Sequence, residues 1–203
     1  MRFTLASDHF DYYSNHGYIG FDGLFSPKLL EDVENIVTKN SRDLWRSNLS
    51  VKSVVFERTC AEIAAELTRA KQVRLGFDQA LCSNDSLPFG KSSSSLADLL
   101  CIQPITCGMM LRLTEGNSPL PSTIFCPCPE KRGTALFFSA KMLMTLLPLT
   151  ELKNQKFLLV GYAGPKPLYV AKETDPAVHS LKNLGYGFGD HLNTTTHPIL
   201  FSK

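Results

Sequence analysis

Two short apolar runs in the second half of the chain constrain the fold more than any other feature. Residues Ala135 to Phe138 and Phe157 to Tyr162 are mainly aliphatic and aromatic, and glycine or polar residues bound each run. Short apolar runs with such boundaries are typical of buried strands. The sequence therefore predicts that these two runs are paired strands in the core of a sheet.

The first part of the chain predicts a helix, a strand and a second helix within residues 8 to 37. Gly17 suits the left-handed position that ends a helix, and Tyr18 to Phe21 form a short apolar segment. Ser26 is a good helix cap, and Pro27 fits the first helical position. The residues that then share one helical face are Leu29, Leu30, Val33, Ile36 and Val37.

Further elements follow from hydrophobic periodicity. A helix is expected from Glu57 to Ala70 and a strand from Val73 to Phe77. A strand with one buried face is expected where apolar residues alternate, at Ile105, Cys107, Met109, Leu111 and Leu113. We also expect Pro165 and Pro167 to break the chain before an edge strand at Leu168 to Val170. A last helix should start at Asp175, end at Gly185, and turn Val178, Leu181 and Leu184 inward.

Composition describes an ordinary globular protein. With 203 residues, 43% of them hydrophobic and 20% charged, the chain fits a single domain spanning residues 1–203. Its net charge of +2 is scattered, which argues against nucleic acid as a partner. The six cysteines lie in apolar stretches, so we expect reduced thiols. No secretory signal or membrane-spanning run is evident, which predicts a cytoplasmic protein, although export by a non-classical route stays open.

Three segments resemble the phytanoyl-CoA dioxygenase family of Fe(II)/2-oxoglutarate oxygenases. They are residues 8 to 37, with Asn-x-Gly-Tyr and Gly-Leu-Phe-Ser; residues 73 to 81, with Asp-Gln; and residues 133 to 164, with Phe-Phe. The resemblance implies a mainly β fold with flanking helices (α+β). Specifically, it implies a double-stranded β-helix, a jelly-roll or cupin-like barrel, with N-terminal helices packed on its major sheet.

The same resemblance implies where iron and 2-oxoglutarate would bind. The family's His-x-Asp falls on Leu96-Ala97-Asp98, its second metal-binding His on Met144, and its 2-oxoglutarate-binding Arg on Gln155. A thioether is a poor ligand for Fe(II), and an amide cannot replace the charged clamp of a guanidinium. Lys156, beside Gln155, offers a point charge instead. Asp98 is thus the one retained metal-ligand position.

We interpret the chain as a catalytically inactive relative of these oxygenases, a binding or interaction scaffold without a cofactor. One alternative is an Fe(II)/2-oxoglutarate oxygenase with a relocated site, in which Lys156 holds 2-oxoglutarate and Asp98 joins two histidines from His179, His191 and His197. A second alternative is a carrier of a small apolar ligand in a barrel mouth lined by Met144, Met109 and aromatic residues. The partner is therefore either an unidentified protein or a small apolar ligand, and the sequence does not indicate the oligomeric state.

Overall fold

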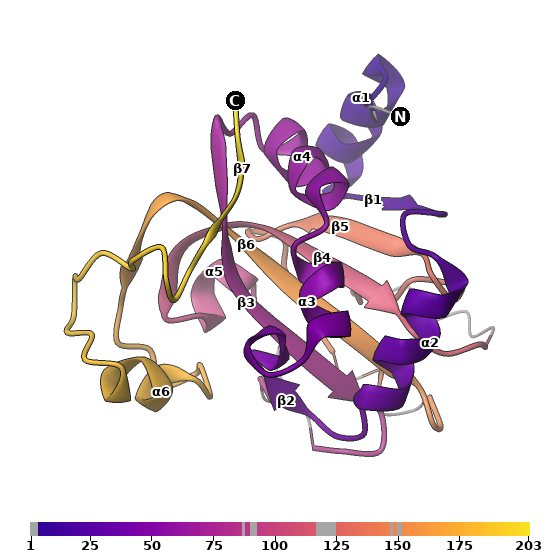
Figure 1. The fold of residues 1–203 in the computed structure, drawn as a ribbon. Helices are drawn as coiled ribbons and strands as arrows, with labels where there is room; N and C mark the ends of the chain where they lie inside the picture. The colour runs from indigo at the N-terminus through magenta and orange to yellow at the C-terminus, as the bar shows by residue number, and fades with distance from the viewer. Residues whose placement is uncertain (1–3, 87, 90–92, 117–124, 147, 150–151) are drawn as a thin grey trace.

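The structure is a computed structural model that describes residues 4–86, 88–89, 93–116, 125–146, 148–149 and 152–203 (Figure 1). Its centre is a seven-stranded antiparallel sheet in the order β1-β5-β4-β6-β3-β2, with β7 paired to β3. The strands are β1 (Tyr18–Phe21), β2 (Ser41–Arg42), β3 (Gln72–Cys82), β4 (Ile102–Arg112), β5 (Ala135–Ser139), β6 (Lys156–Tyr169) and β7 (Ile199–Ser202). The helical elements are α1 (Ser7–His16), α2 (Pro27–Ile36), the short η1 (Leu44–Arg46), α3 (Leu49–Val55), α4 (Arg58–Leu67), α5 (Leu96–Leu99) and α6 (Val178–Asn183).

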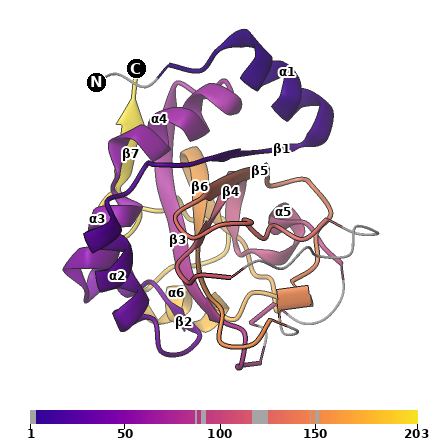
Figure 2. The same ribbon diagram turned by 90° about the vertical axis from the view of Figure 1, so that its right-hand side faces the viewer.

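The two faces of the sheet carry separate apolar clusters. Helices α2, α3 and α4 lie against one face (Figures 1 and 2), and the side chains between them and the sheet form the first cluster. The second cluster lies on the other face, where α5, α6 and the long connections pack. Members of the first cluster include Val33, Val54, Ile63, Met109, Phe137 and Val160. Members of the second include Phe77, Leu96, Met110, Phe138, Met144 and Leu159.

Burial on both faces explains the two apolar runs. Along β6, Leu158 and Val160 enter the first cluster, whereas Phe157 and Leu159 enter the second. The prediction of two core strands is confirmed, but the predicted pairing between them was wrong, because β5 and β6 lie on either side of β4 and each pairs with it. For β4 the expectation of a single buried face was wrong, because residues 107 to 112 are buried on both sides. A strand covered on both faces needs apolar side chains at consecutive positions.

The N-terminal elements follow the predicted capping chemistry. Gly17 ends α1 with φ of 78°, and the Ser26 hydroxyl oxygen accepts a hydrogen bond of 3.3 Å from the Leu29 amide at the start of α2. Helix α4 is slightly shorter than predicted, and Ile63 and Leu67 face inward as expected. Residues 41 to 55, which form β2, η1 and α3, carried no prediction.

Two expectations for the C-terminal part were wrong. Strand β6 continues to Tyr169, so Leu168 belongs to it instead of to a separate edge strand. Pro165 and Pro167 are tolerated because they lie where β6 has no partner residue on β4, between the pairs Ile105–Ala163 and Gln103–Leu168. Leu184 is 56% exposed, whereas Val178 and Leu181 are buried as predicted. The apolar C-terminal tail pairs with β3 through β7.

The structure also bears on the cysteines and on membrane insertion. All six cysteines are free, and Cys60, Cys101 and Cys107 are buried. In the part of the chain that the structure describes, no helix has the length and apolar character needed to cross a bilayer.

Candidate functional site

The structure brings Leu96 and Met144 together, the two positions that the resemblance assigns to iron-binding histidines. Ser94 and Met144 exchange two backbone hydrogen bonds of 3.0 and 3.1 Å, which joins the segment before α5 to the segment after β5. Leu96 is 0% exposed and Met144 is 2% exposed. Both side chains belong to the second cluster, together with Phe138. We call Leu96, Phe138 and Met144 the apolar site.

Close packing of the apolar site depends on a glycine in β4. A Cβ atom added to Gly108 would lie 2.5 Å from the Phe138 ring and 2.8 Å from Leu96 Cδ1, far inside contact distance. The missing side chain at Gly108 therefore lets both residues pack directly on the strand. Because hydrocarbon and a thioether occupy the two positions, the residues here do not fit an Fe(II) centre, which prefers imidazole and carboxylate ligands.

Asp98, the retained carboxylate position, lies in the short helix α5, and its side chain contacts the N-cap residue Ser95. Its residue is exposed, and its Oδ2 accepts a hydrogen bond of 2.6 Å from the Ser95 hydroxyl. The same Ser95 oxygen accepts a hydrogen bond of 3.1 Å from the Asp98 amide, so serine and aspartate together cap α5. The carboxylate thus has a local structural partner outside the buried site.

Gln155 directly precedes β6, Lys156 is the first residue of β6, and their side chains contact different parts of the structure. The Gln155 Oε1 atom accepts hydrogen bonds of 2.7 Å from Arg112 Nη2 and 2.7 Å from Thr114 Oγ1. Lys156 Nζ instead donates a hydrogen bond of 2.8 Å to the backbone oxygen of Glu34, in α2 on the helix-covered face. The two side chains therefore extend in different directions, as those of consecutive extended residues do.

Arg112 was not singled out from the sequence, yet it holds the Gln155 side chain. Its side chain is 0% exposed. Besides Gln155, its guanidinium donates hydrogen bonds to the backbone oxygens of Thr114 (3.2 Å), Pro129 (3.1 Å) and Glu130 (2.9 Å). These acceptors are all neutral, and they come from three separate stretches of chain. The only sequence signal is a charged residue inside the apolar run from Met109 to Leu113.

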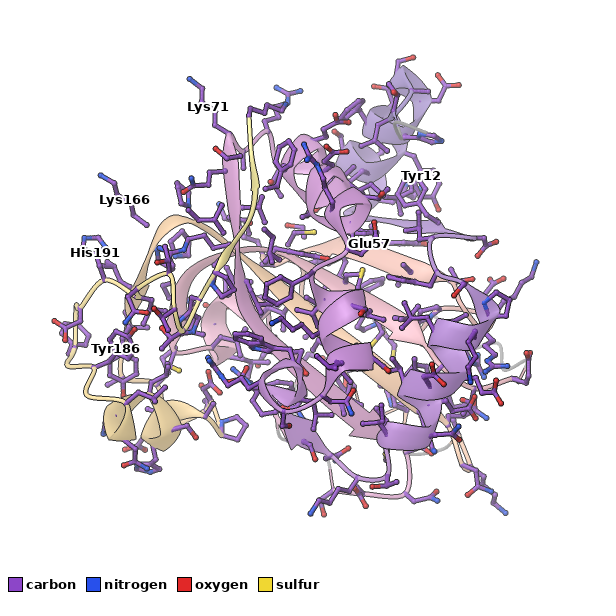
Figure 3. All side chains as sticks on the ribbon, in the orientation of Figure 1. Tyr12, Glu57, Lys71, Lys166, Tyr186 and His191 are labelled. Atoms are coloured by element: carbon purple, nitrogen blue, oxygen red, sulfur yellow. The ribbon has the colours of Figure 1, made fainter. Side chains whose placement is uncertain are left out.

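The histidines proposed for a relocated metal site do not converge with Asp98. His179 and His191 are exposed, and Figure 3 shows His191 on the C-terminal tail at the edge of the molecule. His197 is buried, with Nδ1 2.9 Å from Thr196 Oγ1. Among the described residues, which include these histidines and Asp98, no three or more His, Cys, Asp or Glu side chains gather closely enough to hold a metal ion.

His197 lies in a positively charged environment. Its backbone oxygen accepts a hydrogen bond of 2.8 Å from Arg74 Nε, and Arg46 Nη2 donates one of 2.7 Å to the neighbouring oxygen of Thr196. Burial, and to a smaller extent the charges of Arg46, Arg74 and Arg42, lower the pKa of His197 from 6.5 to about 3. A neutral imidazole fits this position, which packs the tail against β3.

A buried ion pair closes the side of the second cluster near α6. Arg42 Nη2 lies 3.4 Å from Asp175 Oδ2, and the guanidinium stacks over the Phe77 ring with 4.1 Å to its centroid. Asp175 also accepts hydrogen bonds of 2.8 Å from the Cys101 amide and 2.9 Å from the Ala177 amide. The prediction that Asp175 caps the last helix was wrong, because α6 begins at Val178 and its N-cap residue is Ala177. Asp175 instead joins the segment before α6 to Arg42 of β2 and to Cys101, just before β4.

The methionines are divided between the two faces of the sheet. Met109 belongs to the first cluster, where the Tyr162 hydroxyl lies 3.6 Å from its sulfur. Met144 belongs to the second cluster. The two side chains therefore do not line one barrel mouth as the carrier alternative expected, because adjacent clusters are separated by the sheet itself.

Solved structures with a similar fold include non-heme iron enzymes. SnoK, a non-heme α-ketoglutarate-dependent carbocyclase from nogalamycin biosynthesis, matches with a TM-score of 0.71 and 14% identity over 97% of each chain. The epimerase SnoN, in complex with Fe³⁺, α-ketoglutarate and nogalamycin RO, matches with a TM-score of 0.70 and 12% identity over 96% of this chain and 98% of that one. CT296 from Chlamydia trachomatis matches with a TM-score of 0.53 and 21% identity over 80% of this chain and 97% of that one.

These comparisons establish the architecture. No protein-family model and no curated protein matches at the level of sequence. The chain has the fold of the non-heme iron, 2-oxoglutarate-dependent enzymes, and its antiparallel sheet with flanking helices is consistent with the predicted double-stranded β-helix. At these sequence identities the likeness concerns the fold, and function has to be argued from the side chains of this chain.

Proposed function

We propose that this chain is a non-catalytic protein that uses the fold of the 2-oxoglutarate-dependent enzymes as a scaffold for binding another protein. The observation that carries the proposal is the burial of Leu96 and Met144, which are almost without exposed surface and belong to the same apolar cluster. Two buried groups with neither nitrogen nor oxygen donors leave no first pair of ligands for Fe(II).

The polar groups near Gln155 support the same proposal. A 2-oxoglutarate carboxylate is best held by a charged, bidentate donor that is free to face it. Arg112 is the buried guanidinium that contacts Gln155. It already donates four hydrogen bonds, one to Gln155 and three to backbone oxygens. Of the five N–H groups of an arginine, about one is left. Arg112 therefore stabilises the connections around the sheet and has little capacity for a second ligand.

A protein partner is favoured over a carried ligand by the exposed apolar side chains beside the apolar site. Leu143, next to Met144, is 65% exposed, and Tyr12 on α1 is 42% exposed (Figure 3). Tyr12 begins a series of aromatic contacts that runs inward: Tyr12 to Tyr18 (6.0 Å between centroids), Tyr18 to Phe125 (4.9 Å) and Phe125 to Phe138 (5.9 Å). Large apolar and aromatic side chains at a surface are common anchors of protein interfaces.

Metal content and turnover test the proposal. The purified chain is equilibrated anaerobically with Fe(II) and 2-oxoglutarate, desalted, and assayed for iron by mass spectrometry; succinate is then measured after oxygen is admitted. We expect substoichiometric iron and no succinate above a protein-free control. A characterised oxygenase treated in parallel confirms that the assay detects coupled and uncoupled turnover. Stoichiometric iron together with succinate release would contradict the proposal.

A further inference from the structure

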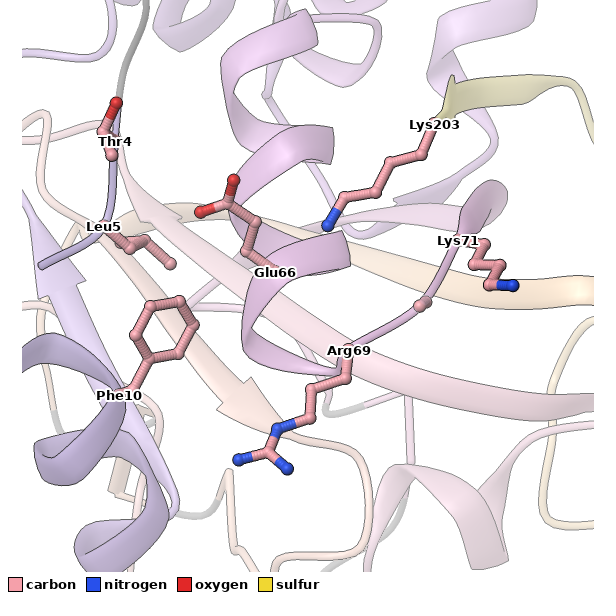
Figure 4. Close-up of a pocket in the computed structure, with 8 residues that line it drawn as sticks. Thr4, Leu5, Phe10, Glu66, Arg69, Lys71 and Lys203 are labelled. Carbon is pink, nitrogen blue, oxygen red and sulfur yellow. The ribbon is translucent and has the colours of Figure 1, made fainter. Parts of the chain in front are cut away.

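A second site, unrelated to the apolar site, lies between α1, the end of α4 and the end of β7. It is a pocket of about 700 Å³, within the range of small-molecule sites. Its lining residues are Thr4, Leu5, Phe10, Glu66, Arg69, Ala70, Lys71 and Lys203 (Figure 4). These residues come from three distant parts of the sequence, so the pocket is a product of the tertiary fold.

One side of the pocket is apolar and is formed by Leu5 and by Phe10 of α1. No residue of α1 is fully buried, and its contact with the first cluster runs through partly buried side chains such as Phe10 and Tyr13. Leu5 is buried just before the helix. Leu5 and Phe10 line the same side of the pocket in Figure 4. An apolar chain placed there would cover hydrocarbon surface that is now open to solvent.

The opposite side of the pocket is cationic. The Lys203 amide donates a hydrogen bond of 2.9 Å to the Lys71 backbone oxygen, so the backbones of these two residues are adjacent. In Figure 4 the Lys203 side chain extends towards Glu66, and the Lys71 side chain extends away from it. Arg69, with φ of 55°, adds a third cation at the turn before β3. Within the described ranges, none of these three side chains forms an ion pair with a carboxylate. Glu66 is the one acidic residue in the lining.

We propose that this pocket binds a single-chain amphiphilic carboxylate, such as a medium-chain or long-chain fatty acid. The carboxylate lies at Lys71 and Lys203, and the hydrocarbon chain follows Phe10 and Leu5. Three cations and one carboxylate in the lining leave the pocket with a net positive charge, which attracts a ligand carboxylate. Glu66 disfavours a multiply charged head group such as a phosphate. This site is independent of the function proposed for the barrel, and either proposal stands if the other fails.

Calorimetric titration of the full chain with decanoate, at low ionic strength and below the micellar range, tests this site. We expect saturable 1:1 binding that weakens with added salt, because the cations are exposed. Acetate and decanol should each bind at least about 10-fold more weakly, since each lacks one half of the ligand. Nuclear magnetic resonance should place the largest amide shifts at Leu5, Phe10 and Ala70.

A pair of charge-matched variants locates the carboxylate. Lys71→Gln with Lys203→Gln should weaken decanoate binding by about 10-fold, because two exposed charge contacts are lost. Lys166→Gln with Lys182→Gln removes the same charge from exposed positions outside the pocket and should change affinity by less than about 2-fold. Ala70→Phe places a ring in the pocket lining and should weaken binding without removing charge.

Several outcomes would overturn the proposal. These are the absence of saturable decanoate binding, equal binding of decanol and decanoate, and equal loss of binding in the two lysine pairs. Binding to phosphatidylglycerol vesicles without binding of free decanoate would show that the cations contact a membrane surface instead of a single lipid chain. Thermal unfolding of each variant confirms that the changes in affinity do not come from loss of the fold.

Discussion

The apolar site and the buried ion pair of Arg42 and Asp175 occupy the same cluster but have opposite chemistry. The three side chains of the apolar site, Leu96, Phe138 and Met144, are hydrocarbon or thioether and belong to an apolar cluster. Near α6, a guanidinium and a carboxylate are buried together against Phe77. Burial alone therefore does not explain why the apolar site lacks polar groups, because the same interior accommodates charge elsewhere.

The difference lies in what the buried polar groups connect. Arg42 and Asp175 are 133 residues apart, and the hydrogen bond from Arg74 to His197 spans 123 residues. Each contact fixes a distant segment, either the connection before α6 or the C-terminal tail, to the strands β2 and β3. In the apolar site the corresponding link is the backbone pairing of Ser94 and Met144, which requires no polar side chain. The protein thus retains buried charge where it joins distant segments.

The largest effect should come from breaking the buried ion pair. Asp175→Ala leaves the Arg42 guanidinium and the Cys101 amide without their acceptor. Removing one partner of a buried pair costs about 3–5 kcal/mol. We expect urea unfolding to show a loss of this size in the free energy of unfolding. Glu173→Ala, an exposed acidic residue two positions earlier, is the control and should change stability by less than about 0.5 kcal/mol. Equal losses in the free energy of unfolding for Asp175→Ala and Glu173→Ala would contradict a stabilising role of the buried ion pair.

A smaller loss should follow when a polar group enters the apolar site. Met144→Gln keeps the length of the side chain but buries an amide among Leu96 and Phe138. A buried amide without partners costs about 1–3 kcal/mol. Met144→Leu, which stays apolar, should cost less than about 1.5 kcal/mol. The two variants are compared by chemical denaturation at pH 7. If Met144→Gln were as stable as Met144→Leu, the site would have room for water or a ligand.

The pH dependence of stability tests the environment of the buried His197. The pKa of His197 is lowered from 6.5 to about 3 in the folded chain, mainly by burial. Between these values the unfolded chain binds a proton that the folded chain does not, so this residue makes stability fall as pH decreases below about 6.5. The slope is at most about 1.4 kcal/mol per pH unit. His197→Gln should remove this term, as measured by urea unfolding at pH 7 and pH 5.

Asp78 should act with the opposite sign over an overlapping range. Burial, and then the charge of Asp43, raise its pKa from 3.8 to about 7, against the amides of Trp45 and Leu44 that donate to it. The folded chain then binds a proton that the unfolded chain lacks, so this residue increases stability as pH falls from about 7 towards 4. Compared with the parent chain, Asp78→Asn should lose more stability between pH 7 and pH 5, and His197→Gln should lose less. Identical profiles for both variants would contradict the two assignments.

The sequence was informative where one local pattern determines the structure. The caps at Gly17 and Ser26 and the apolar runs of β5 and β6 are such patterns, and the structure confirms them. Contacts between distant segments have no local pattern. Arg112, Arg42 and His197 look like ordinary polar residues in the sequence, and their burial follows from the packing of the loops and the tail. The hydrogen bond from Lys156 to Glu34 in α2 likewise has no local signal in the sequence.

The smallest effect should come from Asp98, the one position of the family's metal ligands that keeps a carboxylate. It lies close in sequence to Leu96, but its side chain is at the surface and caps α5 through Ser95. Asp98→Asn keeps an oxygen acceptor, so we expect a change in the free energy of unfolding below about 0.5 kcal/mol. Ser95→Ala, which removes the acceptor of the helix amide, should cost about 1 kcal/mol.

Asp98→Asn also tests whether Asp98 binds iron. If Asp98 belongs to the polar surface, Asp98→Asn and the parent chain take up equally little Fe(II) after anaerobic equilibration. If the parent chain binds iron and Asp98→Asn loses it, Asp98 is a ligand and a relocated centre exists next to the apolar site. A carboxylate that binds a metal has to be held towards the metal by neighbouring groups. An exposed carboxylate that is hydrogen-bonded within its own helix is not held in this way. Because the neighbour that holds Asp98 is the capping serine of its own helix, we expect the first result.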